Sequence, residues 1–486
     1  MQVKTRMAPS PTGEYHIGHI RTLLYNYAFA RKESGKFLIR IEDTDRERYV
    51  DGAVERILDV IEDYGFDWDE GPRVGGSCDS YIQSERLPIY KEKALELVSK
   101  GKAYYCFCTQ ERLKEMREMQ QREGMPSTKY DRKCLQLTEK EVEKKLADNV
   151  PYVIRLKVPQ GRIITYNDLV YGDMAVNSND LDDQVLLKSD GFPTYHLGVV
   201  VDDHEMGVTH IMRGMDWLPS TPKHVLLYEA FGWEMPLHCH LPNLKELDGN
   251  RKLSKRFGSV FASDFLREGY LSEAVVNFLM FLGWNPGTER EIYSLEEFIK
   301  DFSVDRLQKT DLVSFDRKKL SWFNGQYIRA LRTEVLLDRI LIWADKYQVD
   351  LVSRDLDRGV ILRVLDLVKD RLRVLSDFND LALYFFTEPE IDKKLLCKFA
   401  KEKKAYEILE AFLDSFNKVA DAGWTKENLE NVCSLVLGIG EYKPKEAYMT
   451  LRVALTGREA SPHIFDVLEL LGKDVVLERI TSALKH

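Results

Sequence analysis

The stretch RMAPSPTGEYHIGHIRT, residues 6–22, decides how the N-terminal part of the chain is expected to fold. Residues 3–7 predict a short strand, a turn rich in proline and glycine follows, and an apolar pattern with helical spacing begins near His16. A strand that enters a helix through such a turn predicts an anion-binding site. The reason is that the first backbone N–H groups of the helix lack partners and its dipole favours negative charge.

Two histidines lie in the first turn of that predicted helix. His16 and His19 are three residues apart and therefore share a face, and Gly18 between them leaves space for a bulky group near the backbone. The alternative is a capped helix with two surface histidines. These four residues alone do not decide between the two interpretations.

The next segments predict alternating strands and helices. A buried strand is expected at residues 37–41 and an amphipathic helix at residues 51–64, which together indicate a parallel, doubly wound sheet. Glu42 follows the second strand, at the edge where such folds bind ligands, and could hold an ammonium group. Asp43 and Asp45 fit better as surface acids that cap the following helix.

Length and composition bound the class of protein. A chain of 486 residues suggests three or four domains, and no apolar run is long enough to cross a membrane. Seven cysteines without a secretory signal favour reduced thiols and a cytoplasmic protein. The net charge of −9 gives no general preference for nucleic acid, so any contact with RNA must come from local basic patches.

Residues 85–195 contain a possible metal site. Cys106 and Cys108 are followed by Cys134, and three thiolates that a loop could bring together suit Zn²⁺. Tyr130 is the first candidate for the fourth ligand, with Asp131 or water as alternatives. Buried cysteines without a metal remain the other interpretation.

Two later segments carry further candidates. Residues 186–201 predict β structure, and Arg213 ends another strand-like run. Asp202-Asp203-His204 could bind a metal, but a turn at a strand end is the favoured interpretation. Residues 252–256, KLSKR, form a glycine-flanked basic loop that could hold phosphates, although a solvated loop would have the same composition.

Together, HIGH at residues 16–19 and KLSKR resemble the two signature motifs of class I aminoacyl-tRNA synthetases. The similarity narrows to bacterial-type glutamyl-tRNA synthetases through further matching segments that span the chain: RMAPSPTGEYHIGH, RIEDTD, FPTYHLGVVVDDHEMGVTHIMRG, STPKHVLLY and LRVALTGREASPHIFDVLELLG. The resemblance implies ATP-dependent activation of glutamate and its transfer to the terminal adenosine of tRNA(Glu). A glutaminyl-tRNA synthetase would end in β-barrels, and a shortened tRNA-glutamylating paralogue would lack the helical C-terminal region. Whether tRNA(Gln) is also charged stays open.

The resemblance also implies roles for individual residues. ATP, with Mg²⁺, would be bound and activated at His16, Gly18, His19, Lys252, Ser254 and Lys255. Glutamate would be bound at Arg6, Ala8, Ser10, Glu42, Tyr195 and Arg213, with both arginines on its side-chain carboxylate and Glu42 on its ammonium group. Val199 departs from some relatives, which carry asparagine there, so one polar contact would be lost or supplied by water.

The implied domain order is as follows. A Rossmann-like catalytic domain comprises residues 1–84 and 196–231, and it is interrupted by an α+β acceptor-binding domain, residues 85–195. A stem-contacting domain that carries KLSKR spans residues 232–330, and a helical anticodon-binding region spans residues 331–486. Arg371 and Arg373 lie where the family reads anticodon bases, and a monomer is the default expectation.

Overall fold

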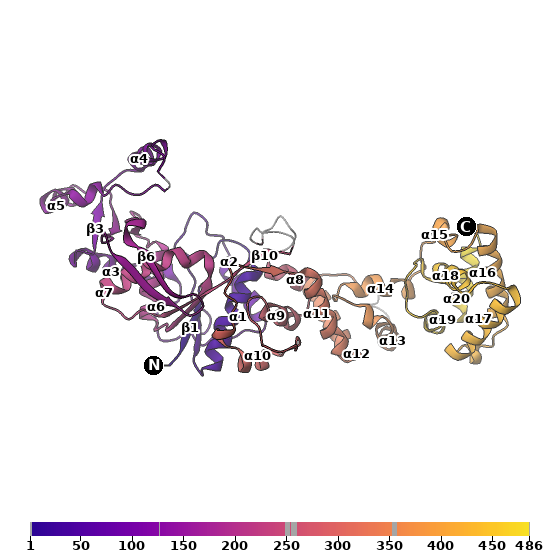
Figure 1. Ribbon diagram of the computed structural model, residues 1–486. Helices are drawn as coiled ribbons and strands as arrows, with labels where there is room; N and C mark the ends of the chain where they lie inside the picture. Colours follow the sequence, from indigo (N-terminus) through magenta and orange to yellow (C-terminus); the bar gives the residue numbers. More distant parts are fainter. Residues whose placement is uncertain (1, 126, 248–252, 254–259, 352–356, 486) are drawn as a thin grey trace. The chain divides into compact units, whose positions relative to one another are not determined.

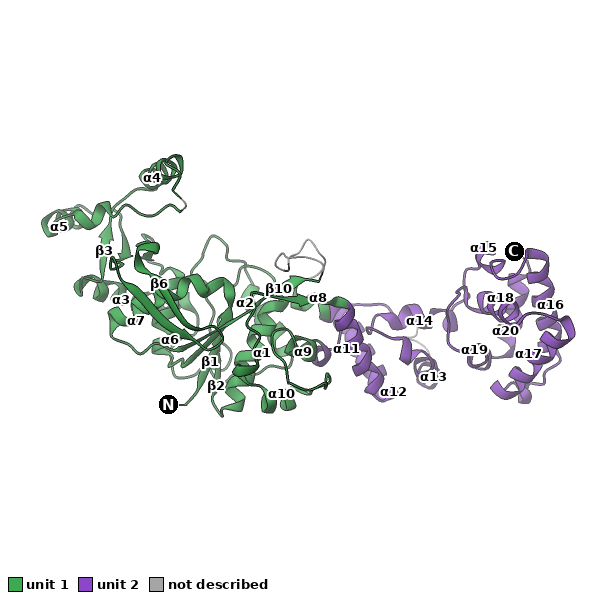
Figure 2. Cartoon of the chain, viewed as in Figure 1, with its two compact units in different colours: residues 1–265, 275–317 green, residues 266–274, 318–486 purple. Residues whose placement is uncertain are grey.

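The computed structural model describes residues 2–125, 127–247, 253, 260–351 and 357–485 (Figure 1). Contacts within the chain divide it into two compact units (Figure 2). Unit 1 contains residues 1–265 and 275–317, and unit 2 contains residues 266–274 and 318–486.

The centre of unit 1 is a parallel sheet. Its central strands are β1 (Lys4–Met7), β2 (Lys36–Ile39), β8 (His210–Gly214) and β9 (Leu237–Leu241). β1 pairs in parallel with β2, and β8 pairs in parallel with β9. The Thr209 N–H donates to the Lys4 carbonyl, and the Lys4 N–H donates to Thr209 Oγ1. These bonds join β1 to the start of β8, so the order is β2–β1–β8–β9. The predicted parallel α/β fold is confirmed.

Helices cover this sheet, and their sequences account for their positions. They are α1 (Ile17–Lys32), α2 (Ala53–Asp63), α6 (Tyr195–Glu205) and α7 (Thr221–Phe231). In α2 the buried side chains recur at helical spacing, and the exposed ones are acidic or basic. The remaining elements near the carboxyl edge are the short 3₁₀ helix η4 (Met215–Ser220) and the parallel pair β10 (Asn243–Glu246) and β11 (Leu312–Phe315).

The β structure predicted up to residue 201 is wrong beyond residue 194, because Tyr195–Glu205 forms helix α6. Its apolar residues Leu197, Val199, Val200 and Val201 are all buried, in a core that α3 and α7 also line. A helix buried on several faces loses its helical periodicity, so a short apolar run resembles a buried strand. The two acids predicted at a strand-end turn, Asp202 and Asp203, instead lie inside α6 with buried side chains.

The segment between β2 and α6 adds one small sheet and one hairpin. An antiparallel sheet joins β3 (Ala103–Cys106), β4 (Val153–Leu156) and β7 (Val185–Leu187). A hairpin of β5 (Ile163–Asp168) and β6 (Gly172–Asn177) extends the central sheet, because Asp168 of β5 pairs with His238 of β9. The helices of this segment are α3 (Leu87–Ser99), α4 (Gln110–Arg122) and α5 (Glu139–Ala147).

Helices α8 (Ala262–Arg267), α9 (Ser272–Met280) and α10 (Leu295–Asp301) follow. The described residues of unit 2 beyond residue 317 form only helices, as predicted. They are α11 (Arg317–Ala330), α12 (Thr333–Tyr347), α13 (Arg358–Val368), α14 (Asp377–Phe386), α15 (Lys393–Leu396), α16 (Glu402–Asn417), α17 (Lys426–Gly440), α18 (Pro444–Thr456), α19 (Ile464–Leu471) and α20 (Lys473–Ala483). Among the described residues, no helix has the length and apolar character needed to cross a bilayer.

Asp202 of α6 is the point at which several elements of unit 1 are joined. Its carboxylate accepts hydrogen bonds from Gln83 Nε2 (2.8 Å), Arg86 Nε (3.0 Å) and Tyr90 Oη (2.8 Å). The Asp202 side chain is fully buried. Buried charges are tolerated only when they are paired and hydrogen-bonded, so this acid fixes the start of α3 against α6.

We predict that Asp202→Ala lowers the free energy of unfolding of unit 1 by about 3–5 kcal/mol, because it leaves the Arg86 guanidinium buried without its partner. Urea titration followed by circular dichroism measures this loss. The control is Asp59→Ala, which removes an acid whose side chain is 62% exposed and pairs with Arg73. It is expected to cost about 1 kcal/mol or less. Equal losses in the two variants would contradict the prediction.

Candidate functional site

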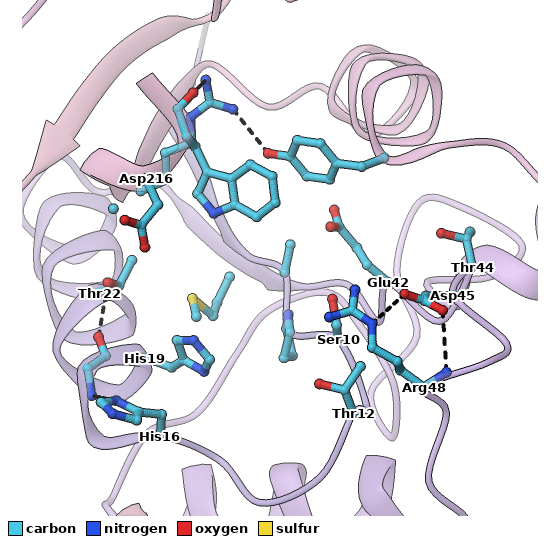
Figure 3. A pocket seen from close by; sticks show the side chains of 18 of the residues that line it. Ser10, Thr12, His16, His19, Thr22, Glu42, Thr44, Asp45, Arg48 and Asp216 are labelled. Carbon is cyan, nitrogen blue, oxygen red and sulfur yellow. Dashed lines mark hydrogen bonds and ion pairs between the residues drawn. The ribbon is translucent and has the colours of Figure 1, made fainter. Parts of the chain in front are cut away.

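The carboxyl ends of β1, β2 and β8 open into a cavity of about 920 Å³. This size and position suit a small-molecule site. Figure 3 places His16, His19, Thr22 and Asp216 on one side of the cavity and Glu42, Thr44, Asp45 and Arg48 on the other. Nine of the predicted residues line it together: Arg6, Ala8, Ser10, His16, Gly18, His19, Glu42, Tyr195 and Arg213.

The start of α1 differs from the predicted anion site. His16 is the N-cap, and its Nδ1 accepts a hydrogen bond from the Gly18 N–H (3.0 Å). The N–H of Ile17 donates to the Val260 carbonyl, and that of His19 donates to the His16 carbonyl. Three of the first N–H groups therefore already have partners, and the expectation of an anion site made by free backbone donors is wrong. A Cβ at Gly18 would lie 3.1 Å from His16 Nδ1, so a side chain there would crowd this cap.

On the opposite side, Arg6 and Glu42 are each held by a buried partner of opposite charge. Arg6 Nε donates to Asp203 Oδ1 (3.2 Å). Arg40 donates to Glu42 Oε1 (2.9 Å) and to Asp203 Oδ1 (2.8 Å). Burial raises the pKa of Glu42, although Arg40 and Arg6 act against that rise. The side chain of Arg40 is fully buried, so this pairing orients Glu42 and Arg6 from behind the cavity.

Arg213 is held by neutral groups. Its five N–H groups meet His240 Nε2 (3.0 Å), Tyr195 Oη (3.1 Å), His224 Nδ1 (3.3 Å), the Trp217 carbonyl (3.3 Å) and Thr221 Oγ (2.8 Å). Burial lowers the pKa of His224 and of His240, and the nearby Arg213 charge lowers both further. Both imidazoles are therefore neutral and can accept hydrogen bonds from Arg213.

Several cavity residues were missed by the sequence analysis. Asp216 and Trp217 follow Arg213 by three and four positions, and Trp217 stacks on Tyr195 with ring centroids 4.1 Å apart. Asn243 and Leu244 follow β9, which is also a parallel strand ending at this edge. Their positions just after strand ends were the available signal. Lys188 also lines the cavity, and its ammonium donates to the Thr44 carbonyl (3.0 Å).

The basic loop of the prediction is described only at Leu253, whose N–H donates to the Leu244 carbonyl (2.7 Å) and whose side chain lines the cavity. The three predicted ATP-binding residues of this loop, Lys252, Ser254 and Lys255, lie outside the described residues.

Comparison with known proteins identifies the family. Residues 2–322 match the model of the catalytic domain of class I tRNA synthetases (E and Q), and residues 335–484 match an anticodon binding domain. The glutamate–tRNA ligase of Clostridium kluyveri is 42% identical, covering 100% of this chain and 98% of its own. That of Treponema denticola is 41% identical, covering 100% and 99%. The chain belongs to the glutamate–tRNA ligase family of class I tRNA synthetases.

Solved structures agree with this placement. A glutamate–tRNA ligase from Elizabethkingia meningosepticum, in complex with its amino acid, is 35% identical with a TM-score of 0.89, covering 100% of this chain and 99% of its own. The glutamate–tRNA synthetase of Elizabethkingia anophelis is 36% identical with a TM-score of 0.88, and each chain is covered completely. Both structures match this chain over its full length, which includes the helical C-terminal region.

Outside the cavity, this synthetase brings the predicted metal ligands together. Tyr130 Oη lies 3.4 Å from Cys106 Sγ and 3.3 Å from Cys108 Sγ, and Cys108 Sγ lies 3.5 Å from Cys134 Sγ. A hydrogen bond from Cys134 is the main cause that lowers the pKa of Cys106, to about 4. Asp131, the alternative ligand, instead pairs with Arg112.

The two arginines predicted to read anticodon bases lie in unit 2. The Arg371 guanidinium donates to the Ser461 carbonyl, and its charge, with those of Arg452 and Arg458, counters the rise that burial causes in the pKa of Tyr384. The Arg373 backbone N–H is held by Asp377 (2.7 Å). Arg371 is thus part of a basic cluster around Tyr384, which the sequence did not reveal.

Proposed function

We propose that this chain activates L-glutamate with ATP and transfers the glutamyl group to the 3′-terminal adenosine of tRNA(Glu). The observation that carries the proposal is a single cavity that joins two kinds of surface. Arg213, Tyr195 and Glu42 line it and suit an amino acid with a second carboxylate, and His16 and His19 lie across the cavity from Glu42 (Figure 3). The names of the relatives agree with this substrate.

Glutamate would be bound at both of its ends. The ionised Glu42 carboxylate would pair with the α-ammonium group, while Arg6 and Tyr195 would donate to the side-chain carboxylate. Tyr195 Oη accepts from Arg213, so its own hydrogen can be donated to the substrate. Arg213 would then act through Tyr195 and through its charge. Ala8 and Ser10 line the same surface, where small side chains leave room for the substrate backbone.

ATP would lie against His16, Gly18 and His19, with Lys252, Ser254 and Lys255 on its phosphates. An α-carboxylate oxygen of glutamate attacks the α-phosphorus, and the bond to the departing pyrophosphate breaks, which yields glutamyl-adenylate. The chain's groups contribute by holding the reactants in line and by neutralising charge. Mg²⁺ bound with ATP would supply further neutralisation of phosphate charge.

In the second reaction, a ribose hydroxyl of the terminal adenosine attacks the activated carbonyl and AMP leaves. Within the domain order proposed from the sequence, residues 85–195 would hold the acceptor end, residues 232–330 the stem, and residues 331–486 the anticodon. The cluster of Arg371 with Arg452 and Arg458 supports an RNA contact there. We propose that Arg373 also contacts the RNA.

The function is tested by two assays on the purified protein. ATP–pyrophosphate exchange is expected with glutamate and not with glutamine or aspartate. Aminoacylation of purified tRNA(Glu) is expected, and a parallel reaction with tRNA(Gln) determines whether that tRNA is also charged. Exchange that depends on glutamine instead would support the glutaminyl alternative, and charging without an anticodon requirement would support the shortened paralogue.

We also propose that Cys106, Cys108, Cys134 and Tyr130 bind Zn²⁺. In a tetrahedron with Zn–S bonds of about 2.3 Å, neighbouring sulfurs lie about 3.8 Å apart and a bound oxygen slightly closer, which is near the separations of these atoms. Arg112 approaches Cys108 Sγ (3.5 Å), and Arg155 lies 4.2 Å from the centre of the Tyr130 ring. Their charges would offset the excess negative charge of four ionised ligands.

We predict that Arg213→Ala lowers kcat/KM for glutamate activation by about 100-fold or more, because it removes the charge opposite the carboxylate and leaves several buried acceptors unpaired. ATP–pyrophosphate exchange measures the effect. Arg31→Ala removes a partly exposed arginine that pairs with Asp67 and Asp69 away from the cavity, and it should retain wild-type kinetics. Near-normal activation in Arg213→Ala would refute the role.

The pairing of Arg40 with Glu42 predicts a pH effect. Glu42 must be ionised to bind the ammonium group, and its pKa is raised by burial and held down by Arg40. Arg40→Met should raise this pKa further, so KM for glutamate should begin to increase at a higher pH as the pH is lowered. Lys36→Met removes a cation that pairs with Glu70 outside the cavity and should leave the profile unchanged. An unshifted acid limb in Arg40→Met would argue against Glu42 as the ammonium ligand.

Metal analysis tests the zinc proposal directly. The purified protein is expected to contain about one Zn²⁺ per chain, and Cys134→Ser or Tyr130→Phe should lower its zinc affinity by about tenfold or more. Asp131→Asn and Cys78→Ser should retain the metal. Protein that contains no zinc and keeps its unfolding temperature in chelator would show that the cluster is not a zinc site.

A further inference from the structure

The two arginines of the proposed carboxylate pocket have different electrostatic partners. Arg6 contacts the Asp203 carboxylate directly, so most of its charge is neutralised within the protein. Arg213 is 4% exposed, and no carboxylate among the described residues forms an ion pair with it. A buried guanidinium that is hydrogen-bonded but not neutralised favours an anionic ligand. Arg213 therefore supplies the net positive charge of the pocket.

His240 lies beside Arg213 because of the sheet register. Arg213 of β8 and His240 of β9 are directly paired in the parallel ladder, so their side chains lie on the same face. Arg213 Nε donates to His240 Nε2 (3.0 Å), and this bond is possible only when Nε2 carries no hydrogen.

Asp168 determines that arrangement of hydrogens. Its Oδ2 lies 2.6 Å from His240 Nδ1, and both side chains are fully buried. A carboxylate acceptor at Nδ1 requires the hydrogen to be there, which leaves the Nε2 lone pair for Arg213. Although burial raises the pKa of Asp168, the hydrogen bond from His240 acts to lower it, and burial lowers the pKa of His240. The pair is therefore an ionised acid and a neutral imidazole.

We propose that Asp168 and His240 are positioning residues for glutamate selection, which orient Arg213 through a neutral acceptor and so preserve its charge for the substrate carboxylate. This inference rests on the proposed glutamate activation. A carboxylate in the place of His240 would orient Arg213 equally well, but it would neutralise the guanidinium and weaken the preference for glutamate over glutamine. The imidazole places the acid one ring further away, where it fixes the tautomer without contacting Arg213.

The hydrogen bond between Arg213 and His240 also affects Tyr195. Arg213 donates through Nη1 to Tyr195 Oη, so an Arg213 that is held at Nε by His240 also determines how the phenol presents its hydrogen. Loss of the Nε bond would leave the Arg213 charge and the Tyr195 hydroxyl less well oriented toward the substrate carboxylate, whereas the ATP side of the cavity would be unaffected. Substitution of His240 should therefore change KM for glutamate and leave KM for ATP nearly unchanged.

The test compares three substitutions at His240 by ATP–pyrophosphate exchange. His240→Leu removes the acceptor and should raise KM for glutamate by about tenfold or more while KM for ATP stays within about twofold. His240→Gln can present a carbonyl oxygen near the position of Nε2 and should restore KM for glutamate to within about threefold of wild type. His240→Glu should lower the preference for glutamate over glutamine by about tenfold or more.

His238→Leu is the matched control, because His238 is a fully buried histidine on the same strand whose Nδ1 contacts the Pro236 carbonyl. It should leave the ratio of the two KM values unchanged. If His240→Leu does not fold, the contrast between the Gln and Glu substitutions tests the same point. Asp168→Asn offers hydrogens to His240 Nδ1, reverses the tautomer and should reproduce the His240→Leu phenotype.

Three results would overturn the inference: equal kinetics for His240→Leu and His240→Gln, a parallel rise in both KM values, or an undiminished glutamate preference in His240→Glu. Each of these is measured against wild-type protein that activates glutamate, so it leaves the proposed function intact. A wild-type protein that gives no glutamate-dependent exchange overturns the proposed function, and the inference with it.

Discussion

The pairing of buried arginines with buried acids is the constraint on which the catalytic unit depends. Arg6 lies in β1 and Arg40 directly follows β2, and both donate hydrogen bonds to the Asp203 carboxylate of α6. Asp202, its neighbour in α6, holds Arg86 and Tyr90. Because none of these charges reaches bulk water, each fixes the position of the others, and the helix that carries the acids cannot shift without exposing or separating an ion pair.

This constraint explains which parts of the sequence could be interpreted in advance. The strand, turn and helix of residues 6–22 follow local rules. The clustering of Cys106, Cys108 and Cys134 was predicted from the shared preference of three thiolates for one metal ion. Helix α6 could not be recognised, because its apolar residues are buried on several faces and its acids are satisfied by residues more than a hundred positions away. Hydrogen bonds and ion pairs to residues so far away in the chain leave no pattern in the local sequence.

In the candidate site, too, some features follow from the local sequence and others depend on distant residues. The sequence indicated which side chains line the cavity, since most of them follow a strand or begin a helix. It did not reveal how these side chains are already engaged: His16 caps its own helix, Glu42 is paired with Arg40, and every N–H of Arg213 has an acceptor. Donor and acceptor assignments of this kind depend on β8, β9 and α7 meeting in space, and motif spacing carries no information about them.

The charges around the proposed glutamate pocket suit both the bound amino acid and the intermediate formed from it. Among five buried residues at this pocket, Arg6, Arg40 and Arg213 contribute three positive charges, and Asp203 and Glu42 contribute two negative ones, an excess of one positive charge within this group. Glutamate, with two carboxylates and one ammonium group, carries the matching negative charge. When its α-carboxylate becomes the acyl phosphate, the side-chain carboxylate and the ammonium group would, in the proposed binding mode, remain near Arg213 and Glu42. The groups that select the amino acid can therefore hold it through both reactions, while the charge that changes lies on the side of His16 and His19.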